Sequence, residues 1–508
     1  MSEKSMEGFP RHGIPLRPSV GKTVLFWARG LALAVGLWGS AACTVGPDFR
    51  KPDLELPGDW VGKPLSEELI SPQENLGELA GWWEIFRDPL LSSLVKRALA
   101  SNLDLKMAEA RIRQARAARA AAAGFLGPRV EGSGSFTRTR TPVTGPSPGG
   151  GGSHTEGLIL DHYEAGFDAS WELDIFGGRR RGLEASQADL HAAVENSREV
   201  LVSLVAEVAR EYLELRTLQE RILVARKNLD VQKRTAEITR RRFEAGFASA
   251  LDVANAKAQV ATTEAQIPVL RTSERQRVYS LSLLLGREPG VLMDELSEAG
   301  RLPHAPPAVP TGLPSDLLRR RPDIRRAEAE LHAATARVGV ATAELFPKFT
   351  ITGSMSFQAS DVSSWLQWGS RIWSFGPGMS WRLLETGRVR AEIAQRESLQ
   401  EQALIAYKQT VLTALKEVED ALVAAAREEE HRRALLEAVE ANRRAVDLAL
   451  KLYLEGQTDF LNVLQAQRAL YGSEDELIQS LRNSCLHLVA LYKALGGGWE
   501  EESPEPNF

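Results

Sequence analysis

Cysteine is scarce in this sequence: Cys43 and Cys485 are its only two cysteines in 508 residues. A disulfide framework of the kind that holds small secreted domains together is therefore excluded. The eight histidines show no metal-ligand spacing, and no nucleophile elbow, P-loop or dinucleotide fingerprint is present. The glycine run at 149–152 has no lysine or helix start behind it, which favours a flexible loop over a phosphate-binding loop. We expect a protein without catalytic activity, metal or cofactor.

A basic excess is also missing. The formal net charge is −5 at pH 7, and the arginines are spread among glutamates on predicted helices, as on a solvated helix face. Binding to nucleic acid requires a basic surface that neutralises phosphates. Nucleic acid is therefore not an expected partner.

The apolar run near the start of the chain is short. Leu31–Trp38 cannot cross a bilayer as a helix, but it follows a basic segment and ends in small residues before Cys43, which is the form of a secretory signal. We expect 1–42 to be a signal peptide and the protein to be exported. Residues 43–95 are then expected to form a Pro-rich, polar tether and the start of the first helix, which Asp88 would cap.

Four stretches alternate apolar and polar residues, at about 129–141, 160–175, 348–360 and 371–384. The alternation predicts strands with one apolar and one polar face, of about the 9 to 11 residues that a tilted membrane strand needs. A soluble sandwich strand would give the same pattern, so it is the repetition that favours membrane strands. The residues expected to face lipid are Phe167, Trp171, Ile351, Trp373 and Trp381.

Long intervals without a helix breaker predict very long helices. About 60 residues between Gly182 and Gly246 contain no strong breaker, enough for a helix of roughly 90 Å. Apolar residues at every seventh position predict a coiled-coil seam, and a soluble coiled-coil rod would show the same seam. The seam residues are Val194, Leu201, Val208, Leu215, Ile222 and Leu229.

An internal repeat organises the chain. Gly246 and Gly456 mark equivalent sharp turns, and the same spacing relates Leu251 to Leu461. We expect one copy at 96–300 and a second at 301–497, each a helix, a strand pair, a very long helix, a turn and a helix, with a tail at 498–508. Each copy supplies only two strands, and hydrocarbon does not tolerate open strand edges. Membrane strands would therefore require other chains to close a barrel.

Several motifs resemble TolC-type outer-membrane efflux factors, in particular the NodT-type lipoprotein subgroup. They lie at 43–49 (CTVGPDF), 317–331 (LLRRRPDIRRAEAEL) and 381–388 (WRLLETGR). The resemblance implies an α+β membrane protein in which a homotrimer forms a twelve-stranded barrel, continued by a periplasmic α-helical barrel. It also implies three partners: a periplasmic adaptor, an inner-membrane transporter of the resistance-nodulation-division (RND) class, and outer-membrane lipid.

The resemblance assigns a modification to Cys43. This cysteine would carry a thioether-linked diacylglycerol and an N-acyl chain, and such an anchor binds a bilayer durably. One departure from the usual pattern is Ser40, which stands where these signals commonly have leucine.

A constriction is implied at the periplasmic end of the tunnel, where the family carries aspartate rings on the helix after the turn. The equivalent positions here hold the uncharged Asn462 and Gln465, while the first repeat keeps Asp252. Three copies of Asp252 would form a carboxylate ring that attracts cations, although aspartates after a turn also serve as helix caps. The candidate constriction residues are Asp252, Asp459, Asn462, Gln465, Leu251 and Leu461.

The function predicted from these features is the outer-membrane channel subunit of an RND-type tripartite efflux pump in a Gram-negative bacterium. It would be a passive exit duct for small toxic compounds. A type I protein-secretion duct is the first alternative, and only the resemblance of the lipoprotein start favours efflux over it. The second alternative is an acyl-anchored coiled-coil lipoprotein without a pore, which would have no use for four alternating strands.

Overall fold

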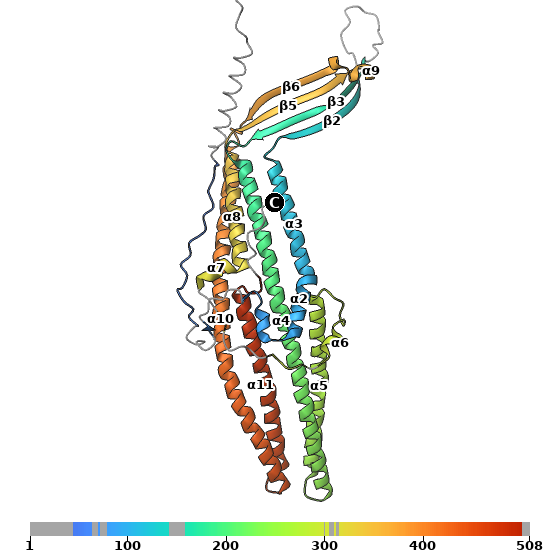
Figure 1. The fold of residues 1–508 in the computed structure, drawn as a ribbon, viewed down its shortest axis with the longest axis vertical. Coiled ribbons are helices and arrows are strands. Elements are labelled where there is room, and N and C mark those ends of the chain that lie inside the picture. Colours follow the sequence, from blue (N-terminus) through green and yellow to red (C-terminus); the bar gives the residue numbers. More distant parts are fainter. Residues whose placement is uncertain are drawn as a thin grey trace, which may run out of the picture. The chain divides into compact units, whose positions relative to one another are not determined.

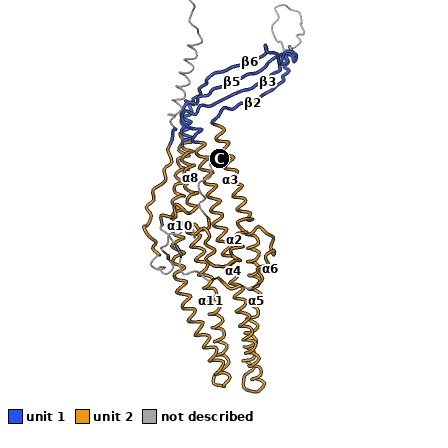
Figure 2. Tube along the Cα trace, viewed as in Figure 1, with its two compact units in different colours: residues 1–46, 126–181, 339–389 blue, residues 47–125, 182–338, 390–508 orange. Residues whose placement is uncertain are grey.

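The computed structural model describes residues 44–62, 70–71, 79–141, 158–298, 300–303, 309–310 and 314–499. The expected signal peptide at 1–42, Cys43 and most of the expected tail at 498–508 lie outside these residues. The chain divides into two compact units (Figure 2). The first consists of the chain up to Gly46 with Leu126–Arg181 and Gly339–Val389, and the second contains the remaining segments.

The first unit contains one antiparallel sheet (Figure 1). Its strands are β2 (Arg129–Thr141), β3 (Leu158–Leu173), β5 (Lys348–Ala359) and β6 (Arg371–Ser380), in the order β2-β3-β5-β6. Each repeat supplies one hairpin, and the hairpins join through β3 and β5, where Phe167 pairs with Met355. The connection between β5 and β6 contains α9 (Val362–Trp365) and η5 (Trp368–Ser370).

Two strands end earlier than the sequence predicts. β3 stops at Leu173 because the Asp174 carboxylate turns to accept the backbone N–H groups of Arg179 and Arg180, which begin the next helix. β6 stops at Ser380, not near residue 384, because Ser380 pairs with Lys348, the first residue of β5. Beyond that pair the strand ladder ends, and Trp381 bonds to the Leu345 carbonyl through its indole N–H.

The second unit is mostly helical. Its elements are η3 (Trp82–Phe86), α2 (Pro89–Ser101), α3 (Leu103–Gly124), α5 (Ala250–Leu284), α6 (Met293–Leu296), η4 (Pro314–Asp316), α7 (Leu317–Arg320) and α11 (Phe460–Ala494). α4 (Gly178–Glu244), α8 (Pro322–Ala343) and α10 (Thr386–Leu454) each have residues in both units, and the short strands β1 (Ile70–Ser71) and β4 (Val309–Pro310) pair in parallel. Among the described residues, no helix combines the length and hydropathy of a transmembrane helix.

Equivalent elements of the two repeats agree closely in length. α3 and α8 have 22 residues each, α5 and α11 have 35 each, and α4 and α10 have 67 and 69. Four of the six predicted seam residues of α4 are buried, Val208, Leu215, Ile222 and Leu229, while Val194 and Leu201 are partly exposed. The structure thus confirms both the internal repeat and the long coiled-coil helices.

The second unit packs around aromatic residues beside the start of α2. Trp82 stacks on Tyr492, with ring centroids 5.4 Å apart. Asp88 caps α2 as predicted by accepting the backbone N–H groups of Leu90 and Leu91, and its second oxygen accepts the Tyr212 hydroxyl at 2.6 Å. One carboxylate therefore fixes the first helix of the repeat to the long helix α4.

The segment that follows Cys43 is extended and lies on the helices. Trp60 is buried, and the Glu419 carboxylate on α10 accepts the backbone N–H groups of Val61 and Gly62 at 2.7 and 2.8 Å. Such bonds satisfy backbone donors that a segment without secondary structure would otherwise leave unpaired.

Candidate functional site

The sheet of the first unit has one apolar and one polar face. Large apolar side chains on one face are exposed in the single chain: Phe167 is 66% exposed, Trp373 70% and Phe375 74%. A contiguous apolar surface of this kind on a folded protein marks a membrane or protein contact. The residues predicted to face lipid (Phe167, Trp171, Ile351 and Trp373) all alternate onto this face, and Trp381 directly follows β6.

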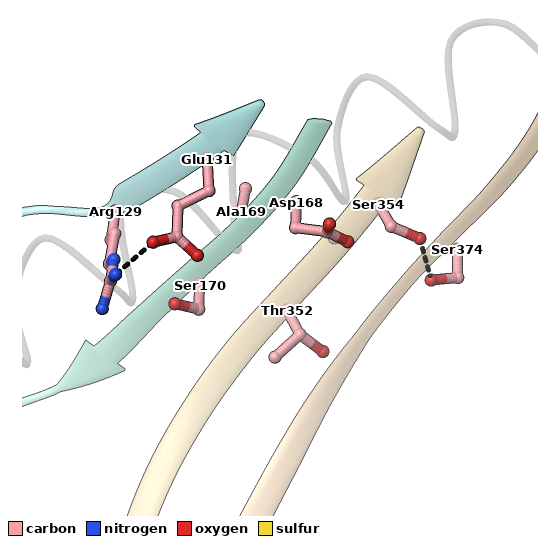
Figure 3. A pocket seen from close by; sticks show the side chains of 9 residues that line it. Arg129, Glu131, Asp168, Ala169, Ser170, Thr352, Ser354 and Ser374 are labelled. Carbon is pink, nitrogen blue, oxygen red and sulfur yellow. Dashed lines mark hydrogen bonds and ion pairs between the residues drawn. The ribbon is translucent and has the colours of Figure 1, made fainter. Parts of the chain in front are cut away.

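The opposite face is polar and hollowed. A hollow of about 280 Å³ is lined by charged and hydroxyl side chains from all four strands (Figure 3). Arg129 forms an ion pair with Glu131 along β2, and the hydroxyls of Ser354 and Ser374 are hydrogen-bonded at 2.8 Å. No group of acidic, histidine or cysteine side chains in the described ranges could hold a metal. The face is therefore suited to contact with water and with polar solutes.

Tryptophans fix both ends of the sheet. At the end joined to the helices, the indole N–H of Trp171 donates to the Leu126 carbonyl at 2.9 Å, and that of Trp381 donates to the Leu345 carbonyl at 3.0 Å. These are equivalent positions of the two repeats. At the other end, Trp365 donates to the Phe357 carbonyl at 3.1 Å. Indoles with an apolar body and a satisfied N–H are typical of membrane interfaces.

The turns between the long helices are closed by glycine, as predicted. Gly246 and Gly456 have φ of 82° and 77°, a left-handed conformation that glycine adopts without strain. In each turn the residue after glycine bonds back to a carbonyl five residues earlier, Phe247 to Arg242 and Gln457 to Leu452. This is the Schellman arrangement that ends a helix sharply.

The candidate constriction residues all lie at these turns, but their contacts differ between the repeats. Asp252 forms a capping box with Ser249, so it stabilises the start of α5. Asp459 is the N-cap residue of α11 without a side-chain cap bond, and Asn462 donates to the Thr458 hydroxyl at 2.6 Å. Gln465 is exposed, as are Leu251 and Leu461. The cap interpretation of Asp252 is thus confirmed, and a lining role for these six residues remains a prediction.

Contacts that join the two helical hairpins, α4–α5 and α10–α11, were not predicted from the sequence. Arg242 of α4 donates to the Leu454 carbonyl of α10 at 2.8 Å, and its guanidinium lies 4.8 Å from the centre of the Tyr453 ring. Further from the turns, Arg468 of α11 donates to the Gln259 side chain of α5 at 2.6 Å. A possible signal was present, because the repeat spacing aligns Arg242 with the apolar Leu452.

Charge pairs within single helices surround these contacts. Hydrogen bonds from Arg240 and Arg241 lower the pKa of the exposed Glu237 to about 2. Glu237 therefore stays ionised throughout the physiological pH range and keeps both arginines on the surface of α4. Arg242, the next residue, is left to reach the second hairpin.

The comparisons with known proteins agree with this architecture. The family model "Outer membrane efflux protein" matches residues 94–287 and 313–497, one segment for each repeat. The toluene efflux pump outer membrane protein TtgF of Pseudomonas putida is 32% identical over 481 residues, covering 94% of this chain and 98% of that protein. Nodulation protein T of Rhizobium leguminosarum bv. trifolii is 31% identical over 460 residues, covering 90% and 95%.

The solved structures give the same result. The outer-membrane channel OprN superposes with a TM-score of 0.83 at 38% identity, covering 90% of this chain and 100% of that chain. This likeness confirms the predicted α+β channel fold, and the family assigns a passive transport role in the outer membrane instead of catalysis. The chain belongs to the outer membrane efflux protein family and is an outer-membrane channel subunit of an efflux pump.

Proposed function

We propose that three copies of this chain close one barrel and one helical tunnel, which act as the exit duct of a tripartite RND-type efflux pump. The main support is that the sheet has two unpaired edges and an exposed apolar face. Among the described residues, β2 and β6 are its two edge strands, and each has only one paired side. Open edges are not tolerated in hydrocarbon, and the apolar face is exposed. Pairing β6 of one copy with β2 of the next would satisfy the edges and place the polar face in a lumen.

Single-channel recording of the purified protein in a lipid bilayer tests this proposal. We expect stable conducting steps from a species whose mass, measured by light scattering, is that of three chains. A rod-like lipoprotein would give no conductance. Monomers or a different oligomer would contradict the trimer.

A periplasmic adaptor and an inner-membrane RND transporter complete the proposed assembly, and small toxic compounds are the proposed cargo. Support comes from relatives whose names describe efflux pumps, TtgF among them. Expression in a Gram-negative strain that lacks its own efflux channels, with the cognate adaptor and pump, should restore resistance to toxic compounds. Restored export of a protein substrate without restored resistance would favour the secretion duct.

Lipidation of Cys43 is proposed as an additional anchor. In cells fed an alkyne-tagged fatty acid, we expect Cys43→Ala to abolish labelling of the protein and to leave a folded body, because the strands also hold the chain in the membrane. Cys485→Ala is the matched control, since Cys485 is buried against the Pro303 carbonyl and cannot accept a lipid. Labelling that persists in Cys43→Ala would refute the modification.

The constriction is proposed to lie at the turn ends of the hairpins. We expect Asn462→Asp to strengthen, and Asp252→Asn to weaken, the block of bilayer conductance by di- and trivalent cations, because each changes the number of carboxylates around the trimer axis. Asparagine at 252 can still accept the Ser249 N–H, so the helix cap persists. Titrating a trivalent cation against single channels gives the blocking constant. Unchanged constants in both variants would remove these residues from the constriction.

A further inference from the structure

The charged residues on the apolar face of the sheet are confined to one end. Counting alternate residues from Phe136 places Arg138 and Arg140 on this face, and the same counting from Trp373 adds Arg371. Asp161, which pairs in register with Arg138, is the single carboxylate of the face within the described strands. We call Arg138, Arg140 and Arg371 the loop-end arginines.

Each of the three arginines lies near the end of its own strand that does not connect to a long helix, two on the edge strand β2 and one on the opposite edge strand β6. At one end, the strands connect to α3, α4, α8 and α10. At the other end, Arg140 is next to the last residue of β2 and Arg371 is the first residue of β6. At the end that connects to the helices, the apolar face carries the hydrogen-bonded indoles of Trp171 and Trp381. It carries no charged residue there within the described strands. The two ends of the face therefore differ in charge.

The contacts of the loop-end arginines leave positive charge available. Arg138 pairs with Asp161 at 2.9 Å, yet its side chain remains 65% exposed. Arg371 donates to the Trp368 carbonyl at 2.7 Å and lies 4.3 Å from the centre of the exposed Trp368 ring. Arg140 is exposed, and no carboxylate of the described chain is paired with it. One carboxylate thus faces three guanidinium groups.

Guanidinium groups on a lipid-facing surface are tolerated at the interface and not at the bilayer centre. The chain connects to α3, α4, α8 and α10 at the other ends of the strands, so in the proposed channel the loop-end arginines would meet the outer leaflet of the outer membrane. In Gram-negative bacteria that leaflet consists of a glycolipid with phosphorylated sugars. Guanidinium binds phosphate through two parallel hydrogen bonds, and neighbouring indoles suit the boundary between sugar and acyl chain.

We propose that Arg138 and Arg140 of one copy and Arg371 of the next copy form a binding site for the phosphorylated sugars of the outer-leaflet glycolipid. Within one chain these residues lie on the opposite edge strands β2 and β6, and pairing of β6 with β2 of the next copy would make the two strands neighbours. The inference rests on the proposed function in two respects, that the apolar face meets lipid and that copies pair through these strands. Arg371 is held in place by Trp368, whereas no carboxylate in the described part of the chain holds the side chain of Arg140. The site would fix the depth and orientation of each copy in the outer leaflet.

Binding of purified lipid A to the detergent-solubilised full-length protein tests the proposal. We expect the triple variant R138Q/R140Q/R371Q to bind fluorescent lipid A at least about ten-fold more weakly than the wild type, since each lost charge-assisted bond weakens binding. Arg129→Gln is the matched control, because Arg129 is an equally exposed arginine on the polar face of the same sheet and should leave binding unchanged. Dephosphorylated lipid A and phosphatidylglycerol should both bind more weakly to the wild type.

Each outcome decides the proposal. Equal lipid A affinity of the triple variant and the wild type would overturn it, and so would equal affinity of the wild type for phosphatidylglycerol. Conductance and trimer mass are measured on the same preparations. Normal channels with unchanged lipid A binding would refute this site alone, whereas a wild type that neither inserts nor conducts would refute the proposed function as well.

Discussion

Arginine in place of Phe167 is expected to destabilise the membrane-inserted protein by about 2 to 4 kcal/mol, while arginine in place of Ser170 should change its stability little. Phe167 is near the middle of β3 and pairs with Met355, which in turn pairs with Trp373, so the new charge would lie in hydrocarbon. Ser170 lines the polar hollow with its cross-strand partner Arg129 and with Glu131 and Asp168, where two carboxylates offset the repulsion from Arg129. Urea titration of the protein folded into phospholipid vesicles measures the difference.

The comparison is informative because both positions are exposed in the single chain. A protein surrounded by water on both faces would tolerate the two arginines equally, and that result would refute the lipid assignment. A second pair, Ile351→Arg and Thr352→Arg, tests the same contrast on β5. The cost at Ile351 should be smaller than at Phe167, because Ile351 pairs with Trp171 near the helix-connected end, where burial of charge is less costly.

Much of the architecture could be predicted because it depends on periodic patterns. Alternation of period two located the strands, the heptad seam located α4, and the equivalent glycines Gly246 and Gly456 of the two repeats located the turns. The depth at which each strand residue lies in the bilayer could not be predicted in this way. Phe167 and Ile351 are alike in the sequence pattern. The register that distinguishes them arises from pairing between β3 and β5, which are far apart in the chain.

Contacts between the hairpins could not be predicted for a related reason. Arg242 and Arg468 have the composition and spacing of a solvated helix face, and a sequence does not show which neighbouring helix that face meets. Similarly, Asp88 was predicted as a helix cap, but its bond to Tyr212 on α4 depends on tertiary packing. Interactions between residues close in the sequence could therefore be predicted, and contact partners distant in the sequence could not.

Loss of the Arg242 side chain is expected to open the turn end of the tunnel. Arg242 joins α4 to α10 through the Leu454 carbonyl and the Tyr453 ring, and this polar contact between hairpins can break without exposing a large apolar core. A hydrogen bond from a charged donor contributes about 1.5 to 3 kcal/mol, and partial exposure to solvent reduces the contribution of this one to about 1 kcal/mol. If three copies open together, losing this bond in each would reduce the free energy that favours the closed state by about 3 kcal/mol. The equilibrium constant for opening would then rise on the order of 100-fold.

We therefore expect Arg242→Ala to raise the open probability of single channels strongly, and the double variant with Arg468→Ala, which also removes the bond to Gln259, to raise it further. Arg241→Ala is the control, because Arg241 pairs with Glu237 on its own helix and joins no second hairpin. Single-channel recording at low divalent cation concentration separates the variants. If Arg242→Ala and Arg241→Ala conduct alike, the contact between α4 and α10 does not hold the tunnel closed. The closed state would then depend on contacts other than the one that Arg242 makes with α10.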